Sequence, residues 1–349
     1  MVFSSSFIYA HERTGDGFFF IKRQLMFAVL GAALFYLASR MDYRLWLRFS
    51  KLGLWMSLLL LILVSIPGLG SRSGGAQRWL NLGLLTFQPA ELAKFFIILF
   101  FSAAAARGVP LGRRLLLVFP SMALLLAQPD FGTVIILSLV LLSLSFLTGV
   151  RARIVIAGAL AIAVGAAILI MRSPYRMARL ATYLNPWEDP AGRGFQLLQS
   201  LLGVFNGEWL GVGLGNGKQK LFYLPEAHND FIFSVVGEEL GFAGISIVII
   251  AFCFLGLLGI SNAMKTMQRS SDTTNNFGLY LGTGITLLLV LQAFINMAVV
   301  LGLLPTKGLT LPFVSYGGSA LTVNMFMAGI LVSLGSRALP SKPPPRVFS

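Results

Sequence analysis

Charged residues are absent from long stretches of the chain, and these stretches recur along almost its whole length. Nine runs contain no Asp, Glu, Lys or Arg: 24–39, 52–71, 95–106, 115–129, 131–150, 154–171, 240–264, 273–306 and 308–336. The hydrocarbon core of a bilayer is about 30 Å thick, and a helix needs roughly 20 mainly apolar residues to cross it. The pattern therefore predicts an all-α, polytopic membrane protein with nine membrane-spanning helices.

The composition agrees with this interpretation. Of the 349 residues, 56% are hydrophobic and 11% are charged, and the mean hydropathy is +0.81. These values exclude an ordinary water-soluble domain. The net charge of +14 would suit a nucleic-acid-binding protein, but in a membrane protein the side on which basic residues lie is more informative than their sum. We therefore expect no nucleic-acid partner.

Basic residues are distributed unequally between alternate loops. One set of loops and ends carries 14 of them: Arg40, Arg44, Arg48, Lys51, Arg107, Arg113, Arg114, Arg151, Arg153, Lys265, Arg269, Arg337, Lys342 and Arg346. The opposite short loops carry six: Arg13, Lys22, Arg23, Arg72, Arg78 and Lys307. Since cytoplasmic loops are enriched in Lys and Arg, the first set and the C-terminus are predicted to be cytoplasmic. Segments 11–23, 69–88, 128–130, 172–230 and 303–317 are then outside.

This topology implies an earlier crossing of the membrane before residue 11. Only residues 1–10 precede it, and ten residues cannot span a bilayer. They also lack the basic n-region of a signal peptide. We therefore expect that most of a first helix is missing from this sequence.

Residues 1–336 are predicted to form a single transmembrane domain, followed by a cytoplasmic, proline-rich tail at 337–349. Its one large insertion is the outer loop at 172–230. Loops of this length inside a compact bundle are usually functional. The loop contains two amphipathic stretches, 175–183 and 195–205, which we expect to lie on the membrane surface with their apolar sides down.

The glycine-rich segment GVGLGNGKQK in this loop resembles a phosphate-binding loop only superficially. A Walker motif would need glycine at Val212 and serine or threonine at Gln219. A surface loop is the simpler interpretation. The alternative is that Lys218 and Lys220 attract an anionic head group by charge alone.

Cysteine and histidine are too sparse for a disulfide framework or a zinc site. The single cysteine, Cys253, lies within a predicted span, and the two histidines, His11 and His228, are far apart. We predict no metal ligands from these residues.

Two groups of charged residues lie within predicted helices, where ionisable groups are costly and often functional. Glu91 and Lys94 are three residues apart and share one helix face. An ion pair that fixes helix packing and a substrate contact are equally compatible with this spacing. Glu238 and Glu239 have no basic neighbour in the sequence, so a structural tie to another element is favoured for them.

Two aspartates, Asp130 and Asp230, each end an outer loop and open a span. Either could cap its helix by accepting hydrogen bonds from free amide groups. Asp230 differs because Glu226 and His228 lie beside it at the edge of the long outer loop. A carboxylate at a dry membrane edge is a candidate general base.

Five sequence strings together resemble the SEDS family (shape, elongation, division and sporulation). They are RWLNLGLLTFQPAELAK, QPDFGT, YRMARLATYLNPWEDP, GVGLGNGKQKLFYLPEAHNDFIFSVVGEELGF and LPTKGLTLPFVSYGGS. The resemblance extends over about residues 3–336. The LPTKG string and the opening FSSSFIYAHERTGDGFFFIKRQL are more similar to the division branch, FtsW, than to the elongation branch, RodA.

The resemblance implies a ten-helix bundle with both ends in the cytoplasm and a large extracytoplasmic loop between helices 7 and 8. It also implies peptidoglycan polymerisation at the division septum of the bacterial inner membrane, with lipid II as substrate. The expected partners are a class B penicillin-binding protein, other divisome membrane proteins and membrane lipids. The family's essential aspartate corresponds to Asp230, although Asn229 stands where threonine is expected.

The implied reaction assigns roles to several residues. Asp230 would take the proton of the attacking hydroxyl group. The leaving pyrophosphate would need cations, and the candidates are Lys94 first, then Arg193, Lys218 and Lys220. The candidate substrate-binding set is completed by Glu91, Asp130, Glu226 and His228. A bound Mg²⁺ or Mn²⁺ would serve the same purpose, although no motif identifies its ligands.

Three alternatives remain open from the sequence. A lipid II flippase would also place charged residues within the bundle, but its polar site must face both leaflets in turn. A RodA-like elongation polymerase would share the chemistry. A noncatalytic scaffold would leave Asp230 dispensable.

Overall fold

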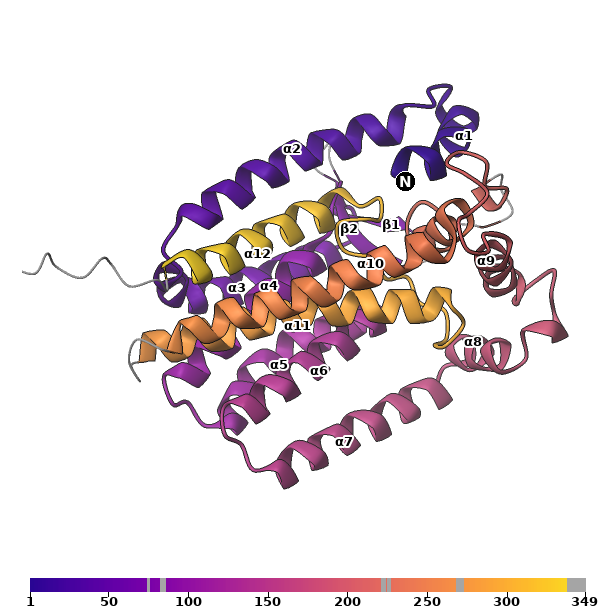
Figure 1. The fold of residues 1–349 in the computed structure, drawn as a ribbon. Coiled ribbons are helices and arrows are strands. Elements are labelled where there is room, and N and C mark those ends of the chain that lie inside the picture. The colour runs from indigo at the N-terminus through magenta and orange to yellow at the C-terminus, as the bar shows by residue number, and fades with distance from the viewer. Residues whose placement is uncertain (74–75, 82–85, 221–223, 225–226, 268–272, 338–349) are drawn as a thin grey trace, which may run out of the picture.

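The protein is described here from a computed structural model that covers residues 1–73, 76–81, 86–220, 224, 227–267 and 273–337. Nine long helices of this part of the chain coincide with the nine predicted spans, and they run side by side as a bundle (Figure 1). They are α2 (Phe19–Arg40), α3 (Arg44–Ser65), α4 (Pro89–Ala106), α5 (Leu111–Ala127), α6 (Phe131–Leu147), α7 (Ala152–Met171), α10 (Ile232–Lys265), α11 (Thr273–Val300) and α12 (Gly318–Arg337). Seven are long and apolar enough to cross a membrane by themselves. The prediction of a multi-pass helical membrane protein is confirmed.

The bounds of one predicted span were wrong. The run 52–71 corresponds to α3, which begins at Arg44 and ends at Ser65. The first turns of α3 include basic residues, which can bury their aliphatic stems while the charged ends reach water. The run 240–264 lies within α10, which begins at Ile232, close to Asp230 where the sequence placed the start of this span, and therefore includes Glu238 and Glu239.

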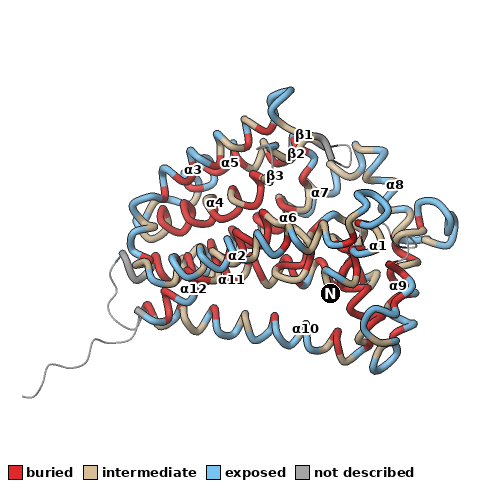
Figure 2. The backbone as a smooth tube through the Cα atoms, turned by 90° about the horizontal axis from the view of Figure 1, so that it is seen from above, coloured by how far each residue is buried: buried red, intermediate tan, exposed pale blue. Residues whose placement is uncertain are grey.

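The centre of the bundle is α4. Fourteen of its 18 residues are buried, and they pack with residues of α6, α11 and α12 in one large apolar cluster (Figure 2). In contrast, α7 contains no buried residue and lies at the edge of the bundle, where it contacts α6 and α8 (Pro174–Leu184) (Figure 1). The charged residues of α4 are therefore held in the best-packed part of the molecule.

The remaining helices lie at one end of the bundle, opposite the C-terminal end of α12 (Figure 1). They are α1 (Val2–Thr14), α8 (Pro174–Leu184), the 3₁₀ turn η1 (Pro186–Glu188) and α9 (Phe195–Asn206). Both amphipathic stretches are thus helical, as their periodicity indicated. However, α9 packs against other parts of the protein. The Ser200 hydroxyl donates a hydrogen bond to Val300 O, and the Ser200 carbonyl accepts one from the Ser234 hydroxyl.

A small antiparallel sheet follows α3, and the pattern of charge-free runs did not predict it. It consists of β1 (Gly70–Ser73), β2 (Ala76–Asn81) and β3 (Thr86–Phe87), in the order β1-β2-β3. Arg78 on β2 donates hydrogen bonds to the carbonyls of Gln128 and Pro129. The sheet therefore anchors the turn that leads into α6.

The first part of α10 ends in a bend at Gly241, where φ is 64° and ψ is −161°. Only glycine adopts this region of backbone space readily. The segment 207–213 supplies hydrogen bonds on both sides of the bend. Two of its amides donate to the carbonyls of Glu238 and Glu239 at 3.0 and 3.2 Å, and one of its carbonyls accepts from the amide after the bend at 2.8 Å. The long outer loop is thereby fixed to α10.

Candidate active site

Asp230 lies just before α10, in a segment whose backbone is held at every carbonyl. The carbonyls of residues 228, 229 and 230 accept hydrogen bonds from Tyr316 N at 2.9 Å, Ser315 Oγ at 2.7 Å and Asn296 Nδ2 at 2.8 Å, respectively. These donors come from α11 and from the loop before α12. The position of Asp230 is therefore set by tertiary contacts rather than by its own helix.

The carboxylate of Asp230 lies against Gly308 in the LPTKG string. A Cβ atom added to Gly308 would be 2.9 Å from Asp230 Oδ2, which is closer than a real Cβ contact. Glycine at this position allows the backbone to approach the carboxylate. Lys307 immediately precedes Gly308 in the chain, so the approach also brings a lysine to this region.

Two cations contact the ring of Phe131, the first residue of α6. Lys307 Nζ is 4.9 Å and Arg176 Cζ is 5.0 Å from the ring centroid, which is the range of a cation–π contact. Burial lowers the pKa of Lys307, because its charged form loses hydration. An anionic group bound beside Lys307 would stabilise that charged form. We had not singled out Lys307 or Arg176 from the sequence.

The helix α8 attaches this region to the long outer loop. Arg179 donates to Thr306 O at 3.2 Å, and Tyr183 donates to Leu303 O at 2.9 Å. Both acceptors belong to the loop between α11 and α12 that also contains Gly308. The loop at 172–230 therefore contributes directly to the surroundings of Asp230.

Asp130 caps α6. Its side chain is buried and Oδ1 accepts a hydrogen bond from Thr133 N at 3.3 Å. The capping interpretation accounts for this aspartate. Its neighbour Phe131 is the residue that approaches the two cations.

Glu91 and Lys94 form a buried ion pair at the start of α4. Lys94 Nζ is 2.9 Å from Glu91 Oε1, and the two side chains are 2% and 7% exposed. Lys94 also donates to Gln292 Oε1 at 2.8 Å, and Gln292 Nε2 donates to Thr310 O at 3.0 Å. The pair is therefore connected through α11 to the loop that contacts Asp230.

Glu238 and Glu239 are structural ties, as expected. The carboxylate of Glu238 accepts hydrogen bonds from Lys218 N at 2.8 Å and Gln219 N at 3.1 Å. Glu239 is fully buried and forms an ion pair with Lys220 at 2.6 Å. Lys220, a candidate for holding pyrophosphate, thus has its charge matched by a buried carboxylate. Ser4 of α1 joins this pair by bonding both side chains.

The other predicted residues are distributed around this end of the molecule. The side chain of Lys218 is exposed, and Arg193 is exposed in the turn before α9, where its amide donates to Asp189. His228 is buried, with its ring centroid 5.1 Å from Tyr9 and 4.9 Å from Phe20. Glu226 lies outside the described residues.

Two polar residues of α11, Gln292 and Asn296, were missed. They lie within the run 273–306, which we interpreted only as a span. Both are buried, at 2% and 1% exposure, and a buried amide in a membrane helix requires hydrogen-bond partners. Their spacing of four residues in an uncharged helix was the signal that could have identified them.

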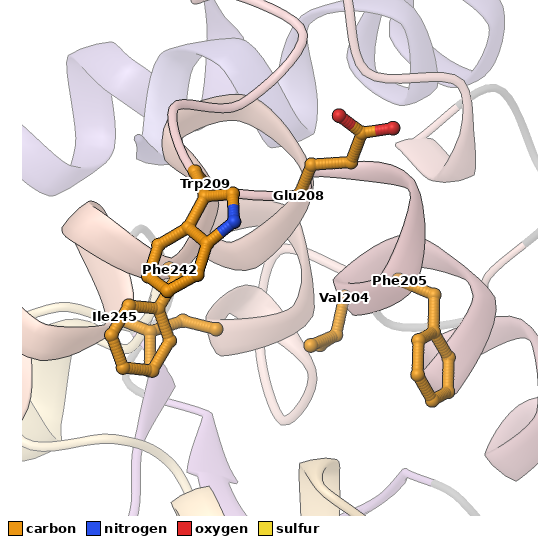
Figure 3. Close-up of a pocket in the computed structure, with 6 residues that line it drawn as sticks. All are labelled: Val204, Phe205, Glu208, Trp209, Phe242 and Ile245. Atoms are coloured by element: carbon orange, nitrogen blue, oxygen red, sulfur yellow. The ribbon is translucent and has the colours of Figure 1, made fainter.

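A cavity of about 420 Å³ lies at the bend of α10 (Figure 3). Trp209 and Phe242 form an edge-to-face pair on one side of it, and Glu208 is the one ionisable residue among those that line it. Asp230 does not line this cavity. Across the described ranges, no group of three or more His, Cys, Asp and Glu side chains is arranged to hold a metal ion.

Comparison with known proteins gives concordant results. Residues 1–338 match the FtsW/RodA/SpoVE family, described as "Cell cycle protein". A probable peptidoglycan glycosyltransferase FtsW from Geobacter sulfurreducens is 43% identical over 97% of this chain and 91% of its own length. A protein of the same name from Thioalkalivibrio sulfidiphilus is 42% identical over 98% of this chain and 87% of its own length.

Two solved structures share the fold. A chain from a peptidoglycan synthase complex that coordinates polymerization and crosslinking superposes with a TM-score of 0.76 at 29% identity, covering 97% of this chain and 96% of its own. The rod shape determining protein RodA of Thermus thermophilus superposes with a TM-score of 0.67 at 25% identity, covering 97% and 95%.

Proposed function

The chain belongs to the FtsW/RodA/SpoVE family of cell cycle proteins, and we propose that it is a peptidoglycan glycosyltransferase that polymerises lipid II during cell division. The names of its relatives support the reaction and the division role. The structural observation that carries the proposal is the position of Asp230. Its carboxylate lies against Gly308. Lys307, which precedes Gly308, and Arg176 both form cation–π contacts with the ring of Phe131.

This arrangement suits an inverting glycosyl transfer. The 4-hydroxyl oxygen of the acceptor's terminal GlcNAc attacks the anomeric carbon of the donor's MurNAc, and Asp230 takes the hydroxyl proton. The bond between that carbon and the pyrophosphate oxygen breaks on the opposite face. Undecaprenyl pyrophosphate leaves with both bonding electrons, so negative charge develops on its oxygen.

Lys307 and Arg176 are the cations that we assign to the leaving pyrophosphate. Fixed cations that face developing charge stabilise a transition state more than a ground state. Lys307 is suited to this role because it is partly buried, and this burial lowers its pKa by disfavouring the charged form, which a bound anion would stabilise. Lys94 and Lys220 are less suited, because each is already paired with a buried glutamate. Chelation and metal replacement would test whether a divalent cation supplies further positive charge to the leaving group.

The assembly and location are part of the same proposal. A class B penicillin-binding protein is the proposed partner, because the fold matches a chain from a synthase complex. We place the protein at the division septum with its C-terminus in the cytoplasm, on the basis of the FtsW names and the basic-residue distribution.

The test is Asp230→Asn. Asparagine is similar in size and caps helices about as well as aspartate, but it cannot act as a carboxylate base. Strand formation from labelled lipid II by the purified protein with its partner should fall by roughly 10²- to 10⁴-fold.

The matched control is Asp16→Asn, which removes an outer-loop carboxylate that bonds Lys22 at 2.7 Å. It should leave strand formation unchanged. Partner copurification verifies folding of both variants. Wild-type strand yield from a well-folded Asp230→Asn protein would refute the mechanism and favour a flippase or a scaffold.

A further inference from the structure

The α11 helix carries two buried amide side chains that face the candidate site. Gln292 and Asn296 are four residues apart, so they lie on one face of the helix, one turn from each other. Both are almost fully buried. Polar groups in such surroundings are costly unless they form hydrogen bonds, and the bonds that these two residues form all lead to the site or to the ion pair beside it.

Asn296 joins the two segments that meet at the Asp230 carboxylate. Its Nδ2 group donates to Asp230 O at 2.8 Å and also to Leu309 O. One amide therefore holds the backbone of the candidate base and the backbone next to Gly308. Its oxygen, Oδ1, is buried and makes no hydrogen bond within the described part of the chain. The side chain thus acts as a double donor, which an aspartate at this position could not be.

Gln292 extends the connection to the buried ion pair. Its oxygen accepts from Lys94 Nζ at 2.8 Å, while its nitrogen donates to Thr310 O at 3.0 Å. The carbonyls held by the two amides belong to consecutive residues, 309 and 310. The loop that contains Lys307 is therefore fastened to α4 through Gln292 and to Asp230 through Asn296.

We propose that Gln292 and Asn296 are positioning residues for glycosyl transfer, which fix the 307–310 segment relative to Asp230. The inference rests on the proposed function. Neither side chain needs to touch the substrate. Their effect is to hold a base and a cation at one separation, so that proton removal and pyrophosphate stabilisation occur in the same bound geometry.

The experiment compares Asn296→Leu and Asn296→Asp, both of which remove the two donors, with Thr286→Val. Thr286 is also buried on α11, but its hydroxyl bonds only to Gly282 O within the helix. We expect both Asn296 variants to lose on the order of 10²-fold in kcat, as for a small misplacement of catalytic groups. KM for lipid II should change much less, and Thr286→Val should match the wild type.

Hydrogen exchange provides a readout that does not depend on activity. In Asn296→Leu, the backbone amides of 228–231 and of 309–311 should exchange faster together, while those of α4 do not change. Gln292→Glu keeps the acceptor for Lys94 and loses the donor to Thr310, so it should speed exchange at 309–311 alone and lower kcat less.

The outcomes separate the two proposals. Wild-type kcat in Asn296→Leu, or unchanged exchange in both segments, would overturn the positioning role. A wild-type protein that forms no glycan strands would overturn the proposed function, while coupled exchange of the two segments would still support the connection through Asn296. If Asn296→Leu does not fold, the Gln292→Glu variant tests the positioning role instead. Unchanged hydrogen exchange at 309–311 in that variant would overturn the inference.

Discussion

Removing the charge of Lys94 should destabilise the protein much more than removing the charge of an exposed lysine. Lys94 Nζ lies 2.9 Å from Glu91 Oε1 and the pair is almost fully buried. In Lys94→Met the carboxylate of Glu91 remains buried without its partner. Its second oxygen, Oε2, already makes no hydrogen bond to the described residues. Breaking a buried pair from one side costs about 3–5 kcal/mol.

That cost should be visible as a lower unfolding temperature. A loss of this size corresponds to a fall of about 4–7 °C for a chain of this length. We would measure it by thermal unfolding in detergent, monitored by the fraction of protein that remains monodisperse. The control is Lys22→Met, which removes the lysine of the Lys22–Asp16 pair. Its lysine side chain is 68% exposed, so the unfolding temperature should not change.

The double variant Glu91→Gln with Lys94→Met distinguishes the pair from its separate charges. Because no charge is left unpaired, most of the lost stability should return. A double variant as unstable as Lys94→Met, or a Lys94→Met protein as stable as the Lys22 control, would refute the reasoning. Polymerisation by a stable double variant would exclude Lys94 as a required contact of the pyrophosphate.

Burial lowers the pKa of Lys307, so its cation is lost at a lower pH than that of an ordinary lysine; Lys307→Arg should move the alkaline limb of kcat/KM to higher pH, and an unmoved limb would contradict the assignment. Gly241→Ala should lower the unfolding temperature because φ is +64° and a Cβ would meet backbone atoms at 2.4 Å, whereas Gly165→Ala on α7, with open space around it, should not. A cysteine at Glu188 should react with an impermeant thiol reagent outside intact cells and one at Arg151 should not; the reverse labelling would invert the topology.

The spans could be predicted from the sequence because a bilayer excludes charge over a fixed thickness. This constraint acts on each helix separately, so a run such as 131–150 identifies α6 without knowledge of its neighbours. Helix ends were less predictable. The run 52–71 continues beyond Ser65 into the turn before β1, because uncharged turn residues do not interrupt a charge-free run. The sheet itself depends on pairing between short segments, which no periodicity over so few residues reveals.

The candidate site was predictable only in part. The family strings indicated Asp230 as the candidate base. The spacing of Glu91 and Lys94 was compatible with an ion pair or a substrate contact, and the structure contains the ion pair. The contacts of Asp230 were not predictable, because Gly308 and Asn296 come from later segments of the chain. Lys220 shows the same limit. Its charge in an outer loop made it a candidate for holding an anionic group, whereas the fold pairs it with Glu239.

The location of the buried ion pairs bears on the choice between a polymerase and a flippase. Glu91–Lys94 lies just after β3 at the start of α4, and Lys220–Glu239 joins the long loop to the start of α10. Both pairs belong to the end of the bundle that the basic-residue distribution places outside. A flippase would have to open this end and the opposite end in turn, and separating a buried pair costs several kcal/mol. A polymerase can keep both pairs intact, because its acceptor, donor and leaving group all react at the outer end. The same contacts that would oppose alternating access therefore favour a rigid catalytic site around Asp230.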